Sequence, residues 1–314
     1  MHSCDKVIES SLIPLRLQQN PFENVSQSCT ARIEDVQADI SQTFIERSWN
    51  ALLDVIGDDP DILYVWYLTI YTYGLYWILG GLFALMDLTN RPKFLRKYKT
   101  QPGTHEPLRW DHFKKLIKTV AFNQVVVAIP TAYISYHCSK LFVTMPNVRV
   151  VPSLGLVLRD MAVCIFVWET GFYYLHRMFH SRHFYQSFHK QHHEWRAPVA
   201  LSAMYAHPLE TLLNSLPPIL LGPGIMRSHL FTTVVWMTFV TWDSLGDHSG
   251  YHLPFLGSSE AHDYHHLNFN QCYGNFGLYD RLHGTDNEFR KKKHYQRHRR
   301  NFGFKSAREL VPGK

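Results

Sequence analysis

The chain has 314 residues, of which 46% are hydrophobic and only 18% charged, and its net charge is +6 with histidine counted as neutral. The five cysteines are odd in number, widely spaced and form no C-x-x-C pair, which argues against a disulfide framework and against a zinc finger. The apolar residues are bunched into runs rather than spread along the chain, and this pattern favours a membrane protein.

Two uncharged runs are long enough to cross a bilayer. Residues 62–86 and residues 119–139 each lie between charged residues and contain none themselves. At about 1.5 Å per residue the first run makes a helix of roughly 37 Å, against a bilayer core of about 30 Å. Pro130 lies inside the second run, where a transmembrane helix tolerates it. Residues 1–60, which precede both runs, are polar and predict an N-terminal extension with weak helices.

Three less regular apolar stretches follow. Charges interrupt residues 150–175, which predicts either a helix of a membrane bundle or an interfacial helix. Residues 211–226 and 228–242 are each short for a span and predict a helical hairpin. We therefore expect an all-α integral membrane protein with about four transmembrane or membrane-embedded helices. Its expected parts are an extension (1–60), membrane helices with a basic loop (61–149), a histidine-rich domain that includes the hairpin (150–290) and a basic tail (291–314).

Basic residues are concentrated in two places. The loop 87–118 holds nine Lys and Arg, and residues 290–314 hold ten against one Glu. The positive-inside rule places such segments on the cytoplasmic side. Adjacent membrane segments make lipid headgroups a better explanation of the tail than nucleic acid, so no nucleic-acid partner is expected.

Histidines form four groups with helical spacing. The motifs are HRMFH, HKQHH, HSGYH and HDYHH, and residues three or four apart share one face of a helix. Neutral imidazole is the usual nitrogen ligand of zinc, iron, copper and nickel, and ten such ligands suit two ions with five each. Each group follows an apolar region, so all four can meet on one membrane face as a helical dimetal domain. The ten candidate ligands are His176, His180, His189, His192, His193, His248, His252, His262, His265 and His266.

The order H-x-x-x-H, H-x-x-H-H and H-x-x-H-H between membrane helices resembles the fatty acid hydroxylase/sterol desaturase superfamily of diiron membrane oxygenases. Within it, the stretches HKQHHEWRAP, YAHPLE, HSGYHLPF, HDYHHLNFNQCYG and LYDRLHGTD are similar to the C-4 methylsterol oxidases. The resemblance is strong over residues 160–290 and loose over the helices from residue 60. It implies insertion of one oxygen atom from O2 into a C–H bond of a sterol or another lipid, such as a fatty acyl or sphingoid chain.

The same resemblance implies the metal ions, the cellular location and the electron donors of the reaction. It predicts two iron ions, which zinc is expected to replace in overexpressed protein, and a multi-pass location in the endoplasmic reticulum membrane with the metal site on the cytoplasmic face. Electrons would come from NAD(P)H through a reductase and a cytochrome b5-type carrier. The chain holds neither a G-x-G-x-x-G loop nor an H-P-G-G haem motif, which agrees with an external carrier.

Position by position, the family pattern covers nine of the ten histidines directly. His252 is the exception, because the C-4 methylsterol oxidases commonly have Asp there. His207 matches a family position near the site and is open as ligand, hydrogen-bond donor or substrate contact. Carboxylates that could orient a ligand imidazole or contact substrate are Glu169, Asp243, Asp247 and Asp263.

Two other classes of protein remain open at this stage. A membrane zinc carrier also bears histidines, but it would hold them near the middle of its spans, and the middles of the two clean runs have none. A non-catalytic relative that binds lipid would be free to lose ligands, whereas every core histidine of the superfamily pattern is present. Hydroxylase, demethylating oxidase and desaturase share these ligands, so the sequence does not separate them.

Overall fold

The computed structural model describes residues 43–142, 144–254, 257–300 and 303–313. The chain divides into two compact units, Met1–Val55 and Ile56–Lys314. Most of the expected extension lies outside the described residues. Its described part contains an amphipathic helix, α2 (Phe44–Ile56), which begins where Thr43 and Glu46 exchange side-chain and backbone hydrogen bonds, the arrangement of a capping box.

The second unit is built from helices. Its described residues contain no strand, and Lys99 and Tyr251 form an isolated antiparallel bridge. Its main helices are η1 (Ile62–Tyr67), α3 (Leu68–Thr89), α4 (Trp110–Phe122), η3 (Asn123–Ala128), α5 (Ile129–Lys140), α6 (Leu154–Phe179), α8 (Leu216–Met226), α9 (Leu230–His248) and α10 (Glu260–Asn268). The remaining helical segments are η2 (Lys93–Tyr98), η4 (Tyr185–His189), η5 (His192–Glu194), η6 (Ala200–Met204), α7 (Pro208–Glu210), η7 (Thr211–Ser215), α11 (Leu278–His283), α12 (Asn287–Arg290), α13 (Lys293–His298) and α14 (Ala307–Leu310).

Two continuous helices are long and apolar enough to cross a membrane. They are Ile62–Thr89, formed by η1 and α3, and Trp110–Lys140, formed by α4, η3 and α5. Large apolar side chains of the first helix, such as Ile70 and Ile78, are exposed, which suits a lipid environment better than the core of a soluble protein. These helices contain the two uncharged runs, so the expectation of two clean spans is confirmed in length and composition.

Among the described residues, the other expected membrane segments do not form helices that are both long and apolar enough to cross a membrane. Helix α6 carries Arg159, Asp160 and Glu169, and α8 has only 11 residues. The expected hairpin is present as α8 followed by α9, although α9 is longer than predicted because its 19 residues continue to His248. Two of the roughly four predicted membrane helices are therefore found.

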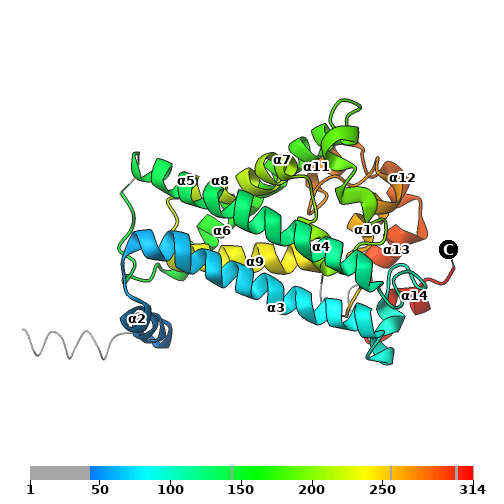
Figure 1. Cartoon of the computed structure of the whole chain (residues 1–314), viewed down its shortest axis with the longest axis horizontal. Coiled ribbons are helices and arrows are strands. Elements are labelled where there is room, and N and C mark those ends of the chain that lie inside the picture. The colour runs from blue at the N-terminus through cyan, green and yellow to red at the C-terminus, as the bar shows by residue number, and fades with distance from the viewer. Residues whose placement is uncertain (1–42, 143, 255–256, 301–302, 314) are drawn as a thin grey trace, which may run out of the picture. The chain divides into compact units, whose positions relative to one another are not determined.

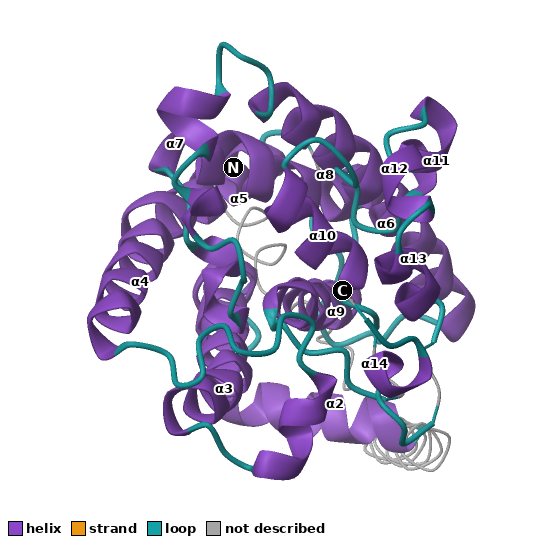
Figure 2. Cartoon of the chain, turned by 90° about the vertical axis from the view of Figure 1, so that its right-hand side faces the viewer, coloured by secondary structure: helices purple, strands orange, loops and turns teal. Residues whose placement is uncertain are grey.

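Within the second unit, helices α3, α4 and α9 extend along a common direction toward the end that carries α10 (Figure 1). Seen from that end, α9 and α10 lie near the centre, with α3, α4, α6 and α8 around them (Figure 2). The C-terminal end of α3 and the basic loop after it lie at the same end. This arrangement gathers the ends of several helices around α10.

Helices α6 and α8 pack closely because α8 has a glycine at the contact. A Cβ atom at Gly222 would lie 2.8 Å from the backbone Cα of Cys164, a distance that real Cβ atoms do not show. Small residues allow the backbones of membrane helices to approach in this way.

We expect Gly222→Ala to reduce the free energy of unfolding by about 1–3 kcal/mol, because α8 must move away from α6 to admit the methyl group. A lower midpoint of thermal unfolding in detergent would show this effect. Gly81→Ala is the matched control, since nothing lies within 4 Å of a Cβ there. Equal midpoints for the two variants would contradict the close contact.

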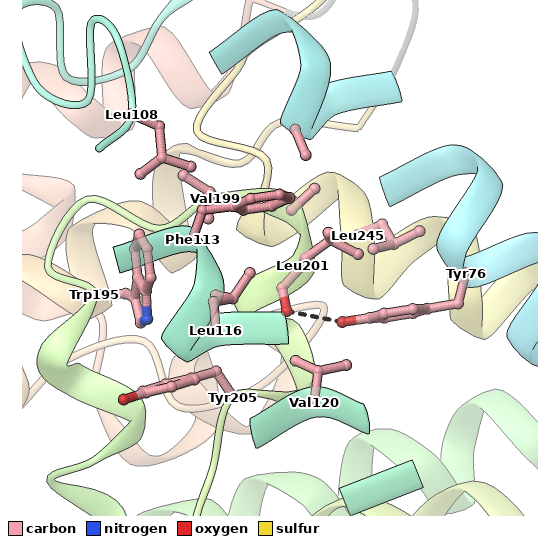
Figure 3. Packing of buried hydrophobic residues seen from close by; sticks show 12 residues of the cluster. Tyr76, Leu108, Phe113, Leu116, Val120, Trp195, Val199, Leu201, Tyr205 and Leu245 are labelled. Carbon is pink, nitrogen blue, oxygen red and sulfur yellow. Dashed lines mark hydrogen bonds between the residues drawn. The ribbon is translucent and has the colours of Figure 1, made fainter. Parts of the chain in front are cut away.

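A hydrophobic core lies between α3, α4, α9 and the segment from Trp195 to Tyr205 (Figure 3). The Tyr76 hydroxyl donates to the carbonyl of Leu201 over 2.8 Å. From the other side, the Asn123 amide donates to the carbonyls of Met204 and Ala206. These contacts fix the segment that directly follows the first H-x-x-H-H motif, so the two apolar helices position that motif.

Candidate metal centre

Nine histidines come together at this end of the second unit, from four separate places in the chain. The last turn of α6 and its C-terminal cap contribute His176 and His180, and α9 ends at His248. The first H-x-x-H-H motif lies on a short π-helix, η4, and a 3₁₀ turn, η5, and the second lies on α10. The nine residues form two groups in which the ligand atoms lie within 4.8 Å of one another: His176, His180, His189, His193 and His265, and His192, His248, His262 and His266.

The first group is centred on His180. Its Nε2 lies 2.8 Å from Nε2 of His189 and 3.1 Å from Nε2 of both His193 and His265. Nε2 of His176 lies 3.2 Å from that of His189. Five imidazole nitrogens therefore point at one small volume.

The second group is built in the same way from four rings. Nε2 of His262 lies 2.9 Å from Nε2 of His248 and 3.0 Å from Nε2 of His266. His192 completes the group, with its Nε2 3.4 Å from that of His248. The groups adjoin, since the rings of His193 and His266 have centroids 4.7 Å apart.

Each H-x-x-H-H motif serves both groups. His189 and His193 enter the first group while His192, between them, enters the second. In α10 the roles are exchanged, because His262 and His266 enter the second group and His265 enters the first. Residues four apart thus share a group, and the histidine three positions after the first belongs to the other group. This division explains why the motif occurs twice.

Hydrogen bonds at the far side of the rings determine which nitrogen carries the proton. Nδ1 of His176, His192, His248 and His265 donates to the carbonyls of Tyr273, Tyr205, Ser244 and Gln271 respectively. A carbonyl only accepts, so the proton must be on Nδ1 and the lone pair on Nε2. Several lone pairs then face one another, which is unfavourable unless a cation lies between them.

Burial keeps these rings neutral. It lowers the pKa of His192 to about 4 and holds the pKa of His265 and His266 well below the usual value for histidine. Only a neutral ring offers a lone pair, so at pH 7 no proton has to be displaced from these rings before a metal binds. The donor set therefore fits two transition-metal ions with nitrogen ligands.

His252, predicted as the tenth ligand, belongs to neither group. Helix α9 ends at His248, and Gly250 adopts a left-handed conformation with φ +70°. The chain therefore turns before His252, whose Nδ1 lies 3.7 Å from Oε1 of Glu260. The groups hold five and four histidines rather than five each.

The other predicted site residues lie around the centre in different roles. His207 caps α7, its Nδ1 accepting from the backbone amide of Leu209. Glu169 accepts three backbone N–H groups from the loop 275–278, close to the carbonyl that receives the proton of His176. Within the described ranges, neither side chain is bonded to a histidine of the two groups.

Two aspartates also have defined places. Asp247 lines a cavity beside His248 and His262. Asp263, on α10, accepts hydrogen bonds from the Thr100 hydroxyl and the Gln101 amide, and burial raises its pKa to about 7. Asp263 thus attaches the histidine-bearing helix to the basic loop rather than to the metal ligands.

Sequence reasoning missed Glu210. Its Oε1 accepts the Nδ1 proton of His189 over 2.7 Å, and the carboxylate is almost fully buried. Burial raises the pKa of Glu210 well above its usual value, and a carboxyl group in this position orients a ligand imidazole. The motif YAHPLE contains this residue, but only the fold shows that it reaches a ring 21 positions earlier.

A cavity of about 280 Å³ opens onto both groups and extends between the helices. His176 and His189 of the first group and His192, His248 and His262 of the second line its inner end. Tyr64 and Tyr136, from the two candidate membrane helices, line another region. Most of the remaining lining is apolar, so the cavity can hold a lipid in contact with the metal centre.

Comparison with known proteins agrees with this geometry. Residues 161–285 match the model of the fatty acid hydroxylase family. Over 237 residues the chain is 40% identical to fatty acid hydroxylase domain-containing protein 2 of Homo sapiens, a match that covers 76% of this chain and 71% of that protein.

Two further relatives carry different names. The chain is 38% identical over 210 residues to fatty acid hydroxylase ahd1 of Mycosarcoma maydis, covering 67% of this chain and 54% of that protein. It is 33% identical over 215 residues to methylsterol monooxygenase 1 of Danio rerio, covering 66% and 72%. No solved structure matches the chain. The resemblance drawn from the histidine motifs is confirmed.

Proposed function

Because the chain belongs to the fatty acid hydroxylase family, we propose that it is a membrane-bound monooxygenase that hydroxylates or oxidises a lipid at a two-iron centre. The most favoured substrate class is a 4-methyl sterol, in line with the methylsterol monooxygenase among its relatives. A fatty acyl or sphingoid lipid is the second. The observation that carries the proposal is the convergence of nine neutral imidazoles into two adjoining groups.

When bound, two iron ions supply the activation of O2 for insertion of one oxygen atom into a C–H bond. The reaction consumes R–H, O2, two electrons and two protons and yields R–OH and water. NAD(P)H would provide the electrons through a reductase and a cytochrome b5-type carrier, and we place the reaction at the cytoplasmic face of the endoplasmic reticulum.

The residues of the chain have three tasks in this proposal. The nine histidines hold the ions, and zinc is expected to occupy the same ligands in overexpressed protein. Backbone carbonyls and Glu210 keep five of the rings in the tautomer that binds metal. Apolar side chains of the cavity, such as Trp168 and Phe172, position the lipid and exclude water.

A zinc carrier is less well supported by the same geometry. The two groups lie at the end of the bundle, and neither includes a residue of Ile62–Thr89 or Trp110–Lys140. A carrier would need ligands near the middle of its spans.

Oxygen incorporation tests the proposed function. We expect purified, iron-loaded protein in lipid bilayers, supplied with NADPH, reductase and a cytochrome b5-type carrier under ¹⁸O2, to place one ¹⁸O atom in a sterol or long-chain lipid product. Mass spectrometry of extracted lipids identifies the product, and omission of the carrier is the control. Failure of the loaded protein to incorporate ¹⁸O into any of these lipid classes would contradict the function.

A further inference from the structure

The cavity that opens onto the histidines has a definite length. Along α9 its lining extends from His248 at the metal centre to Thr233, which is about 22 Å at 1.5 Å per residue. Trp168, Phe172 and Met237 form part of the apolar wall between these ends. A lipid that presents a carbon atom to the metal centre therefore has its apolar body directed toward the far end of the bundle.

Two aromatic rings lie against each other at that far end. The rings of Tyr64 in η1 and Tyr136 in α5 are stacked, with centroids 5.7 Å apart and an angle of 17° between their planes. Tyr136 also lines a second, outer pocket, together with Pro60 and Lys140. The cavity and the outer pocket share Tyr136 and Met145 as lining residues, so these side chains lie between the two spaces.

Hydrogen bonds hold both rings of this tyrosine pair in place. The Tyr64 hydroxyl donates to the carbonyl of Ser228 over 3.2 Å, and the Tyr136 hydroxyl donates to Oδ1 of Asp61 over 2.7 Å. The same carboxylate oxygen lies 2.5 Å from Nζ of Lys140, which is 5.6 Å from the centre of the Tyr136 ring. Moving either ring aside would break its hydrogen bond, and this cost favours a fixed end of the cavity over a mobile gate.

A fixed end determines which chain lengths fit, because a longer chain gains little else from binding here. Chain carbons that leave a bilayer for an apolar cavity exchange one apolar environment for another, so extra methylene groups add no hydrophobic stabilisation. A chain that is too long must displace packed side chains, and overpacking is destabilising. Affinity therefore depends on whether the chain ends before it reaches the tyrosine pair.

We infer that Tyr64 and Tyr136 set the maximum length of the substrate's apolar body, with the end of the lipid chain directed at their rings. The inference rests on the proposed function and specifies the length selectivity of its cavity rather than the class of lipid. The side chain of a sterol and the tail of a sphingoid lipid both end in the apolar carbons that would meet this pair.

Binding to purified full-length protein in bilayer discs tests the length limit without turnover. The probes are two homologous series, 4-methyl sterols and sphinganines, in which the terminal alkyl chain is extended in steps of two carbons. We expect the wild type to bind the first member that is too long at least about tenfold more weakly than the member before it, as an apolar pocket does with surplus methylene groups. The series that shows this fall identifies sterol or sphingoid as the source of the chain.

Tyr136→Ala is the informative variant, because it removes a ring that lies between the cavity and the outer pocket. Its limit should move to longer chains, while the shortest members of the series bind as tightly as they do to the wild type. Tyr64→Ala removes the other ring of the stack and should move the limit in the same direction. This second variant keeps the test decisive if Tyr136→Ala, which truncates a buried side chain, does not fold.

Ala132→Leu makes the opposite change. Ala132 lines the cavity four residues before Tyr136 in α5, so a larger side chain there fills space one turn closer to the histidines. Its limit should move to shorter chains. Tyr71→Ala is the matched control, because Tyr71 belongs to the same continuous helix as Tyr64 but pairs with Thr238 and does not line the cavity. The control should keep the wild-type limit.

Two results would overturn the assignment. One is a wild type whose affinity does not fall along either series, and the other is a limit that stays at the wild-type length in folded Tyr136→Ala or Tyr64→Ala. Neither bears on ¹⁸O incorporation by the wild type, which tests the proposed function separately. Conversely, a protein that shows the length limit but incorporates no ¹⁸O keeps the role of the tyrosine pair and loses the oxygenase function.

Discussion

His192→Ala is expected to lower product formation by more than about 100-fold while the protein still accumulates in membranes. His192 is one of only four rings in the second group, and its Nδ1 is held by the carbonyl of Tyr205. Removal of the ring leaves three imidazoles, so the ion of that group loses a ligand and its position. His265→Ala should have the same effect through the first group.

Lipid product formed by isolated membranes, divided by the amount of protein on an immunoblot, measures the effect. His183→Ala is the control, because this exposed ring belongs to neither group and should be fully active. Wild-type activity in His192→Ala or His265→Ala would show that the ligand assignment is wrong.

Metal content should distinguish the histidines of the two groups from histidines that lie outside them. We expect purified protein to hold close to two metal ions per chain, His180→Ala about one, and His252→Ala two. Nε2 of His180 lies within 3.1 Å of three other ligand nitrogens, so its loss weakens the first group at its centre. His252 lies beside Glu260, outside both groups.

Elemental analysis by mass spectrometry gives these numbers directly. The comparison has an internal control, because both variants replace one of the ten predicted histidine ligands by alanine. Loss of an ion in His252→Ala, together with two ions in His180→Ala, would show that His252 rather than His180 is a metal ligand. Folded, detergent-solubilised wild type without bound metal would contradict the dimetal centre altogether.

The sequence predicts the helices better than it predicts the details of the centre. Long uncharged runs have few alternatives to apolar helices, so the parts of Ile62–Thr89 and Trp110–Lys140 that cover residues 62–86 and 119–139 follow from composition. Residues 110–118, which are predicted from the sequence to belong to the basic loop, instead form the start of the second helix. Charges inside residues 150–175 leave the character of α6 open. The length of α9 is underestimated from sequence because Asp243 and Asp247 interrupt the apolar stretch, whereas the helix continues to His248.

Helical spacing alone also does not predict how the histidines divide between the two groups. It groups residues that are four apart, such as His189 with His193, but it cannot show that His192 faces a different group. An argument from helical spacing assumes that the helix continues. Gly250 has a positive φ, so the helix ends before His252. Glu210 could not be linked to His189 because the contact depends on tertiary packing rather than on spacing.

The position of the cavity has a practical consequence for enzymology. It lies between the two helices that are long enough to cross a bilayer, both of which contribute to its lining. We therefore expect the lipid to enter from the bilayer, so that the relevant concentration is its mole fraction among the lipids rather than its molarity in the assay. An apparent KM should rise in proportion as inert lipid or detergent is added at constant substrate, and affinities compared between preparations require the same surface dilution.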